Sequence, residues 1–367
     1  MTACDGCLRR TALIARLSAH LDRARERWGS ATSLLALEDA ALVAALAGSR
    51  AGDVAAWLEA FDPAEAREAC AAAGLGAVCR HDRALYPEPL RVTPDPPAVL
   101  HVAGGVDRLR ALLAAPAVAL VGARRATPHG LEAARTLARG LAVADVTVVS
   151  GMALGVDAAA HTGALDAGGG SVAVLAGGAD VAYPATERRL HTRLVAAGCV
   201  VSELPPGTRP RKWGFPARNR IIAGLARVTV VVEAAERSGS LITARVARDL
   251  GRDVAAVPGR ITSPRARGAL DLLFDGAQLI RDVRDLLELL HGVGAAGPPP
   301  RAPVSEACAG LDPRLRAVLE AVADGRDTID ALATDSAQAA AAGVALGELE
   351  LMGRLRRVPG GRYVLVS

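Results

Sequence analysis

The stretch "RKWGFPARNRII" at residues 211–222 brings together groups that could hold a nucleic acid. Trp213 and Phe215 lie close together in a chain with only three Trp, three Tyr and three Phe, and Lys212 is the only lysine. From Leu204 to Val232 there is no acidic residue, whereas the basic residues are Arg209, Arg211, Lys212, Arg218, Arg220 and Arg227.

Basic side chains neutralise backbone phosphates, and exposed rings stack on unpaired bases at about 1–3 kcal/mol per base. Because duplex DNA hides its base faces, this combination favours a single strand over a duplex. The alternative is that both rings anchor the loop in the core while the basic residues form a solvated surface.

Four turns rich in Gly and small polar residues follow apolar runs: "VGARRATPHG", "SGMALGVDAAAH", "AGGADVAYP" and "ERSGSLITA". In open α/β sheets, ligands bind beyond the carboxyl ends of the strands, where backbone N–H groups and helix N-termini hold phosphate. The candidate phosphate-facing residues are Gly122, Arg124, Thr127, Gly130, Ser150, Gly151, Ser238 and Ser240, and Thr127 can also cap a helix that opens at Pro128.

The absence of two motifs narrows the kinds of phosphate compound that these turns could bind. The first turn lacks G-x-G-x-x-G, and the second predicted strand ends in Ser150-Gly151 rather than in an acid for a ribose, so a dinucleotide fingerprint is absent. The single lysine is preceded by Arg and followed by Trp, which excludes an NTPase P-loop. An enzyme or sensor that holds a free nucleotide in the same pocket remains the alternative to a single-strand binder.

Asp157 and His161 lie four positions apart on a predicted helix and could form a general acid–base pair. We favour the interpretation that they brace the second turn and orient Ser150 and Gly151. No G-x-S-x-G elbow surrounds Ser238 or Ser240, so neither is predicted to be a nucleophile. We therefore predict no catalytic residue and no cofactor.

The cysteines offer little evidence of metal binding by themselves. Cys4 and Cys7 form a C-x-x-C, which is half of a zinc site at best, and no second C-x-x-C or spaced His pair completes it. We expect a frayed terminal pair of thiols rather than a metal or redox site.

The spacing of apolar residues divides the chain into four segments. Residues 8–74 show helical periodicity and predict a small helical domain. Residues 75–290 begin with a proline-rich lead-in that contains a short predicted strand at "AVLHV". Six apolar runs, predicted to be strands, then alternate with Ala-rich helical stretches: "AVALVGA", "DVTVVSG", "SVAVLAGG", "GCVVSEL", "RVTVVVEA" and "DVAAVPG". This alternation predicts an α/β domain with a doubly wound, mostly parallel, Rossmann-like sheet. Residues 291–310 have the composition of a linker.

The last segment, 311–367, predicts short helices followed by a hairpin with a Gly-Gly turn, which is typical of a winged helix. It carries seven Arg against eight Asp and Glu, whereas a winged helix that binds duplex DNA presents a basic face. We therefore expect contacts with protein, or a regulatory role, from this segment.

Composition excludes several other classes of protein. The net charge is only +4, so an anionic partner must be met by a local patch. No apolar run reaches the roughly 18–20 residues of a membrane helix, and the N-terminus "MTACDGCLRR" has no apolar signal core. We expect a cytoplasmic protein with no membrane partner.

The motifs "VGARRATPHG", "SGMALGVDAAAH", "DVAYP", "SELPPGTRPRKWGFPARNRII" and "SGSLITARVARDLGRDVAAVPG", in this order, resemble the DNA-processing protein A family (DprA, also called Smf). The similarity covers about Tyr86 to Leu290, and "YPEPLRVTPDPPAVLHV" resembles that family's lead-in.

This resemblance implies a dimeric cytoplasmic protein that binds and protects single-stranded DNA and helps to load the RecA recombinase, in natural transformation where that pathway exists. It also implies that Arg124, Lys212 and Phe215 occupy positions of strand-contacting groups. Arg218, Asn219 and Arg220 complete an "FPxRNR" signature, and we predict that these three residues and Arg211 also contact DNA.

Overall fold

The computed structural model describes residues 3–29, 32–292, 311–323, 326, 328–333, 335–358 and 362–365 of the 367-residue chain. The chain forms two compact units, Met1–Gly297 and Pro298–Ser367. Among the described residues, none of the helices combines the length and the apolar character that crossing a bilayer requires.

The predicted helical segment is confirmed, but it packs as part of the first unit. Its α-helices are α1 (Asp5–Arg16), α2 (Ser18–Trp28), α3 (Asp39–Leu46), α4 (Ala51–Glu59) and α5 (Pro63–Ala72), and 3-10 turns cover Thr32–Ala36 and Gly48–Arg50. Leucines from these helices form one apolar cluster with Trp213 and Ala217, which come from the sheet-bearing part of the chain. The helices are therefore attached to the loop that carries the basic and aromatic residues.

The predicted sheet is present and has nine strands in the order β1-β2-β6-β5-β4-β3-β7-β8-β9. The six apolar runs predicted as the buried strands of the sheet are strands β3 to β8, which pair in parallel. The predicted "AVLHV" strand is β2, which pairs antiparallel with β6 and with β1, a strand that the sequence did not predict. The bounds are β1 Gly76–Cys79, β2 Val99–Ala103, β3 Ala117–Val121, β4 Thr147–Ser150, β5 Ser171–Val174, β6 Cys199–Ser202, β7 Val228–Val231, β8 Asp253–Ala256 and β9 Gln278–Leu279.

Helices cover both faces of the sheet because β3 is apolar on both sides. Ala119 and Val121 share a cluster with residues of α11 and α12, whereas Val118 and Leu120 pack with α8 and α9. The helices of this part are α6 Glu88–Arg91, α7 Val106–Ala114, α8 Pro128–Val143, α9 Val156–Asp166, α10 Arg188–Ala197, α11 Gly214–Leu225, α12 Ser240–Asp249, α13 Arg267–Phe274 and α14 Val283–His291, with a 3-10 turn at Ala185–Glu187.

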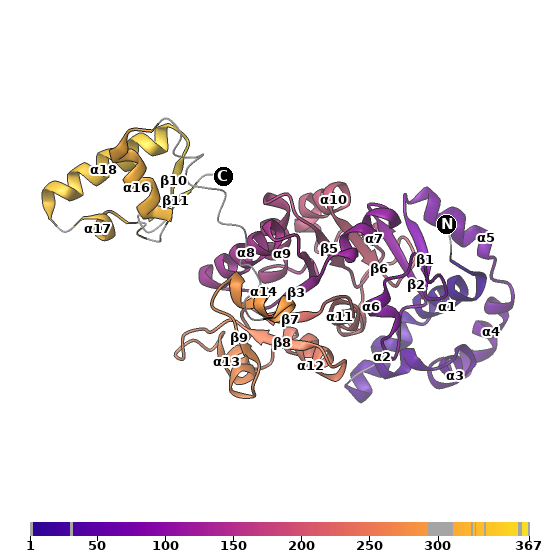
Figure 1. Cartoon of the computed structure of the whole chain (residues 1–367). Coiled ribbons are helices and arrows are strands. Elements are labelled where there is room, and N and C mark those ends of the chain that lie inside the picture. Colours follow the sequence, from indigo (N-terminus) through magenta and orange to yellow (C-terminus); the bar gives the residue numbers. More distant parts are fainter. Residues whose placement is uncertain are drawn as a thin grey trace. The chain divides into compact units, whose positions relative to one another are not determined.

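The strand order reverses at β3. Strands β4, β5 and β6 lie on one side of it, and β7, β8 and β9 lie on the other. Figure 1 shows β1 and β2 on the side of α1 to α5, with β8 and β9 at the opposite end of the sheet. Ligands of doubly wound proteins bind where the strand order reverses, so a site is expected at the carboxyl ends of β3, β4 and β7.

The second unit contains α16 (Pro313–Ala323), α17 (Ile329–Leu332), α18 (Ser336–Leu351) and the antiparallel strands β10 (Leu355–Val358) and β11 (Arg362–Leu365). Leu319, Leu346 and Leu349 form its core with Leu355 and Tyr363. Helices followed by a hairpin confirm the predicted winged-helix arrangement. The predicted Gly-Gly turn lies outside the described residues, as does nearly all of the predicted linker 291–310.

Candidate nucleic-acid interface

Two adjoining hollows open at the carboxyl edge of the sheet, and both are lined by Arg124, Ala153, Phe215 and Arg218. One hollow extends to Tyr183 and Pro184 after β5, whereas the other extends to residues 238–240 after β7. Together they form what we call the switch-point cleft, because they flank the point where the strand order reverses.

A cation and two rings meet in this cleft. The Arg124 guanidinium carbon lies 4.9 Å from the centroid of the Phe215 ring, within the range of a cation–π contact. The Tyr183 ring lies 5.7 Å from Phe215, centroid to centroid, at an interplanar angle of 49°. Arg124 is exposed, Tyr183 is 44% exposed and Phe215 is half-buried, so planar groups remain open to a ligand.

The basic loop before α11 divides into an anchored part and an open part. Trp213 is buried and its backbone N–H donates to Asp22 Oδ1 at 2.9 Å, while Arg211 forms an ion pair with the same carboxylate at 3.6 Å. Lys212 is exposed, and no ion pair of the described residues neutralises it or Arg124. The interpretation that the rings anchor the loop in the core therefore holds for Trp213 and not for Phe215. The sequence suggested that Arg211 is an unpaired cation, whereas the structure pairs it with Asp22.

Arg218 forms the floor of the cleft. Its buried guanidinium Nη1 donates to the carbonyl oxygens of Gly151 and Val174 at 2.5 and 2.6 Å, and its Nε donates to Asn219 Oδ1 at 3.1 Å. These bonds join the ends of β4 and β5 to α11. Arg218 therefore positions the cleft, and because it also lines both hollows its contact with DNA stays a prediction.

Residue 151 must be glycine, because the Arg218 guanidinium lies directly against this turn. A Cβ atom at residue 151 would lie 1.7 Å from Arg218 Nη1. We expect Gly151→Ala to displace the guanidinium and to lower the free energy of unfolding by about 1–3 kcal/mol, as overpacking does. Urea unfolding monitored by tryptophan fluorescence would measure this.

The matched control for this prediction is Gly239→Ala, because a Cβ atom there meets nothing within 4 Å and the backbone φ is −63°. Equal stability of the two alanine variants would contradict the role assigned to Gly151.

Asp157 braces the second turn as expected, whereas His161 braces a different part of the interior. Asp157 Oδ2 accepts the N–H groups of Gly151 and Ala153 at 3.2 and 3.4 Å and lies 3.8 Å from Arg218 Nη2. Burial raises the pKa of Asp157, and burial, aided by the charge of Arg218, lowers the pKa of His161 to about 3. His161 does not reach the second turn, because its Nδ1 pairs with Ser171 Oγ at 2.8 Å on β5.

Three residues that the sequence placed against phosphate are already engaged inside the protein. Thr127 caps α8 and its backbone N–H donates to Glu233 Oε1 at 3.0 Å, while its hydroxyl also donates to Glu233. A Cβ atom at Gly130 would lie 2.7 Å from Glu233 Oε2. The Glu233 carboxylate thus fills the N-terminus of α8, where an anion would bind. Ser150 is fully buried and donates to the Leu120 carbonyl at 2.6 Å, so its predicted phosphate contact is wrong.

Other predicted residues do line the cleft. Gly122 lies next to Arg124 at the end of β3, and Asn219 Nδ2 donates to the Gly239 carbonyl at 3.4 Å. Ser238 and Ser240 hydroxyls are 2.8 Å apart, and both residues line the side of the cleft that follows β7. This side can offer hydroxyl groups to a ligand.

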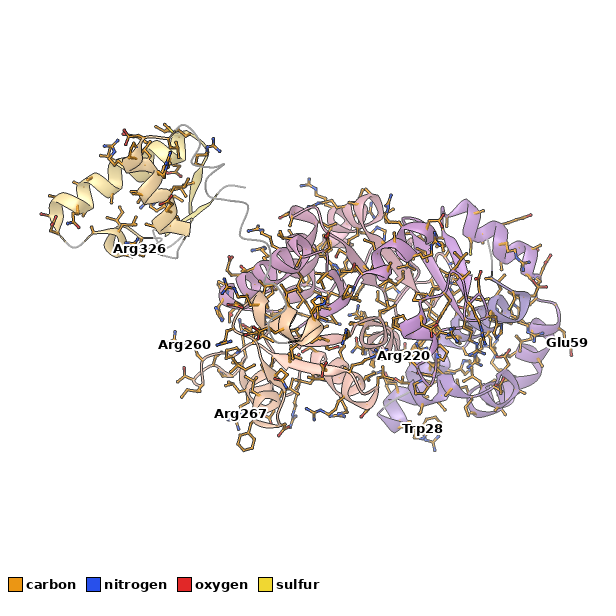
Figure 2. The ribbon with its side chains drawn as sticks, in the orientation of Figure 1. Trp28, Glu59, Arg220, Arg260, Arg267 and Arg326 are labelled. Carbon is orange, nitrogen blue, oxygen red and sulfur yellow. The ribbon has the colours of Figure 1, made fainter. Side chains whose placement is uncertain are left out.

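Arg220 does not belong to the cleft. Its Nη2 lies 2.7 and 2.9 Å from the two carboxylate oxygens of Glu203, and its Nε lies 2.9 Å from Asp95 Oδ2. Figure 2 places Arg220 where the N-terminal helices meet the sheet-bearing part, and its exposed fraction is 6%. The predicted DNA contact of Arg220 is therefore corrected to a buried structural ion pair.

Two residues of the site, Tyr183 and Glu233, were not predicted from the sequence. Tyr183 stood in the quoted third turn, and the scarcity of rings in this chain was a signal that could have singled it out. Glu233 follows a predicted strand, but nothing in the sequence indicates that its carboxylate reaches a helix that begins about a hundred residues earlier.

A doubly wound sheet covered by helices on both faces defines a protein of the Rossmann-like class, and the switch point of this one presents the exposed Arg124 beside the Phe215 and Tyr183 rings. The chain belongs to the DNA recombination-mediator protein A family, which residues 77–291 match, and residues 298–361 match the DprA winged helix domain.

Relatives and solved structures agree with this assignment. Protein Smf of Synechocystis is 34% identical over 310 residues, which cover 76% of this chain and 77% of that protein. The structure of DNA processing protein A from Streptococcus pneumoniae has a TM-score of 0.62 at 34% identity and covers 78% of this chain and 98% of that one. A Helicobacter pylori structure, described in terms of a single-stranded DNA binding mode of DNA processing protein A, has a TM-score of 0.51 at 31% identity and covers 56% of this chain and 92% of that one.

Proposed function

We propose that this protein binds single-stranded DNA in the switch-point cleft, with Arg124 and Lys212 on phosphates and the Phe215 and Tyr183 rings against bases. The observation that carries the proposal is the contact of the exposed Arg124 guanidinium with the half-buried Phe215 ring. Base stacking and charge neutralisation are the two terms that hold single strands without reading their sequence.

The proposal includes the role of a recombination mediator. The bound strand is shielded from nucleases and the protein, a cytoplasmic homodimer without catalytic activity, helps RecA to assemble on it during natural transformation. The family match supports this proposal, and so does the single-stranded DNA binding mode described for the Helicobacter pylori protein.

A free nucleotide is a weaker candidate for the same cleft. The helix N-terminus after β3, which holds phosphate in nucleotide-binding sheets, is filled here by the Glu233 carboxylate. A mononucleotide would also leave Lys212, three residues before Phe215, without a role.

Replacing Arg124 or Lys212 by alanine is expected to weaken binding of an oligo-dT strand by about tenfold, because each variant loses a charge-assisted phosphate contact. Each should also reduce the slope of log affinity against log salt by about 0.7, the value per phosphate for single strands. Fluorescence anisotropy titrations at several salt concentrations measure both quantities.

Two further variants make this experiment specific. Phe215→Ala should weaken binding without changing the salt slope, because it removes stacking and no charge. Arg227→Ala is the matched control, because this exposed arginine belongs to the same basic segment but precedes β7, at the opposite edge of the sheet. Unchanged affinity in both cation variants, or full competition by free nucleotides, would refute the assignment of the cleft.

A further inference from the structure

A cluster of four metal-ligating side chains lies outside the cleft. Cys4 and Cys7 at the start of α1 meet Cys79 and His81 at the end of β1, and one ligand atom from each residue lies within 4.8 Å of all the others. The Sγ atoms of Cys4 and Cys7 are 3.5 and 3.6 Å from His81 Nδ1.

These distances correspond to a tetrahedral zinc site. With Zn–S bonds of about 2.3 Å and a Zn–N bond of about 2.0–2.1 Å, the S···N edges of a tetrahedron are about 3.5 Å and the S···S edges about 3.8 Å. The two S···N separations therefore already equal the edges of a zinc tetrahedron, and no pair of the four ligand atoms is more than 4.8 Å apart.

The backbone holds the ligands in place without a metal. Cys4 is the N-cap residue of α1 and its carbonyl accepts the Leu8 N–H at 3.0 Å, so the expectation of a frayed terminal pair of thiols is wrong. Arg67 of α5 donates to the Ala3 carbonyl at 3.1 Å and pairs with Asp5. Cys79 ends β1, which pairs with β2 in the edge of the sheet, and the Cys79 carbonyl accepts the Asp82 N–H at 2.9 Å.

The burial of the ligands suits a structural metal. Cys7 and Cys79 are 3% and 1% exposed, whereas Cys4 and His81 lie at the surface. Three thiolates and one imidazole select zinc over hard cations, and four protein ligands leave no position for a substrate.

We propose that Cys4, Cys7, Cys79 and His81 bind one structural zinc ion that ties the first helix to the edge strand β1. The ion joins to the sheet the same group of N-terminal helices whose Asp22, on α2, holds the basic loop.

The proposal is tested by measuring zinc in the full-length protein, purified without a histidine tag, by inductively coupled plasma mass spectrometry. We expect about one zinc ion per chain, as for a closed four-ligand site. Cobalt(II) added to the reduced, metal-free protein should produce the thiolate charge-transfer and visible bands of a tetrahedral site.

Cys7→Ala and His81→Ala should both lose the metal, and His81→Ala is the cleaner variant because an exposed side chain contributes little to folding. Cys199→Ala is the matched control, since this buried thiol lies on β6 and faces the Gly105 carbonyl. Failure of the wild-type protein to retain zinc and to give the cobalt spectrum would overturn the proposal. So would equal zinc loss from Cys199→Ala, or full zinc retention by His81→Ala.

Discussion

Replacing Arg220 by methionine is expected to lower the free energy of unfolding of the first unit by about 3–5 kcal/mol, because it leaves a buried charge without its partner. Arg220 is the shared partner of Glu203 and Asp95, at 2.7 and 2.9 Å. Urea unfolding followed by tryptophan fluorescence measures this unit alone, because Trp28, Trp57 and Trp213, the three tryptophans of the chain, all lie in it.

The double variant Arg220→Met with Glu203→Gln provides the control. Of the two carboxylates that lose their partner, it neutralises the more deeply buried one, Glu203, and should recover part of the lost stability. Under conditions in which Arg220→Met is still folded, its affinity for an oligo-dT strand should stay within about twofold of the wild type. Normal stability combined with an affinity loss as large as that of Arg124→Ala would instead make Arg220 a DNA contact.

Acidification from about pH 7 to about pH 4 is expected to remove about 3 kcal/mol of stability through His161 and a similar amount through His101. Burial lowers the pKa of His161 to about 3 and that of His101 to about 4. An unfolded histidine takes up a proton near pH 6.5, whereas the same histidine in the folded protein stays neutral until the pH approaches its lowered pKa. Protons therefore bind the unfolded chain preferentially, and stability present above about pH 6.5 is lost as the pH falls.

His161→Asn isolates one of these contributions, because its amide can still pair with Ser171. Between about pH 4 and 6, the unfolding free energy of the variant should change with pH less steeply than that of the wild type. The two slopes should differ by about 1.4 kcal/mol per pH unit. Asp157 acts in the opposite sense, since burial raises its pKa, and it is unchanged in the variant. Parallel pH profiles for the two proteins would show that His161 already carries its proton in the folded state.

Local patterns were enough to predict most of the fold. The runs from "AVALVGA" to "DVAAVPG" are apolar on both faces, and only a parallel sheet covered by helices buries both sides of a strand. Strand β1 escaped prediction because "GAVC" is short and its strand character depends on pairing with β2. Strand β9 was missed because it has only two residues and its strand character depends on pairing with β8.

The candidate site was predicted in part. Gly122, Arg124 and Phe215 do meet in one cleft, because turns at the carboxyl ends of parallel strands share one edge of the sheet. The "FPxRNR" signature did not by itself show that its two arginines have different roles. Arg218 and Arg220 are two residues apart on α11, and in a helix such positions point to nearly opposite sides. One guanidinium therefore enters the floor of the cleft and the other pairs with Glu203.

The amino-acid sequence by itself determined the α/β class, strands β2 to β8, the Gly-rich turns and the excess of positive charge before α11, because each depends on residues that are neighbours along the chain. Only the tertiary structure decided which charges remain open. Asp22 binds Arg211, Glu233 fills the first helix N-terminus, and Cys79 with His81 joins Cys4 and Cys7. Each of these partners lies far away in the sequence, and only folding brings a carboxylate or a thiol within the few ångströms over which ion pairs and metal bonds form.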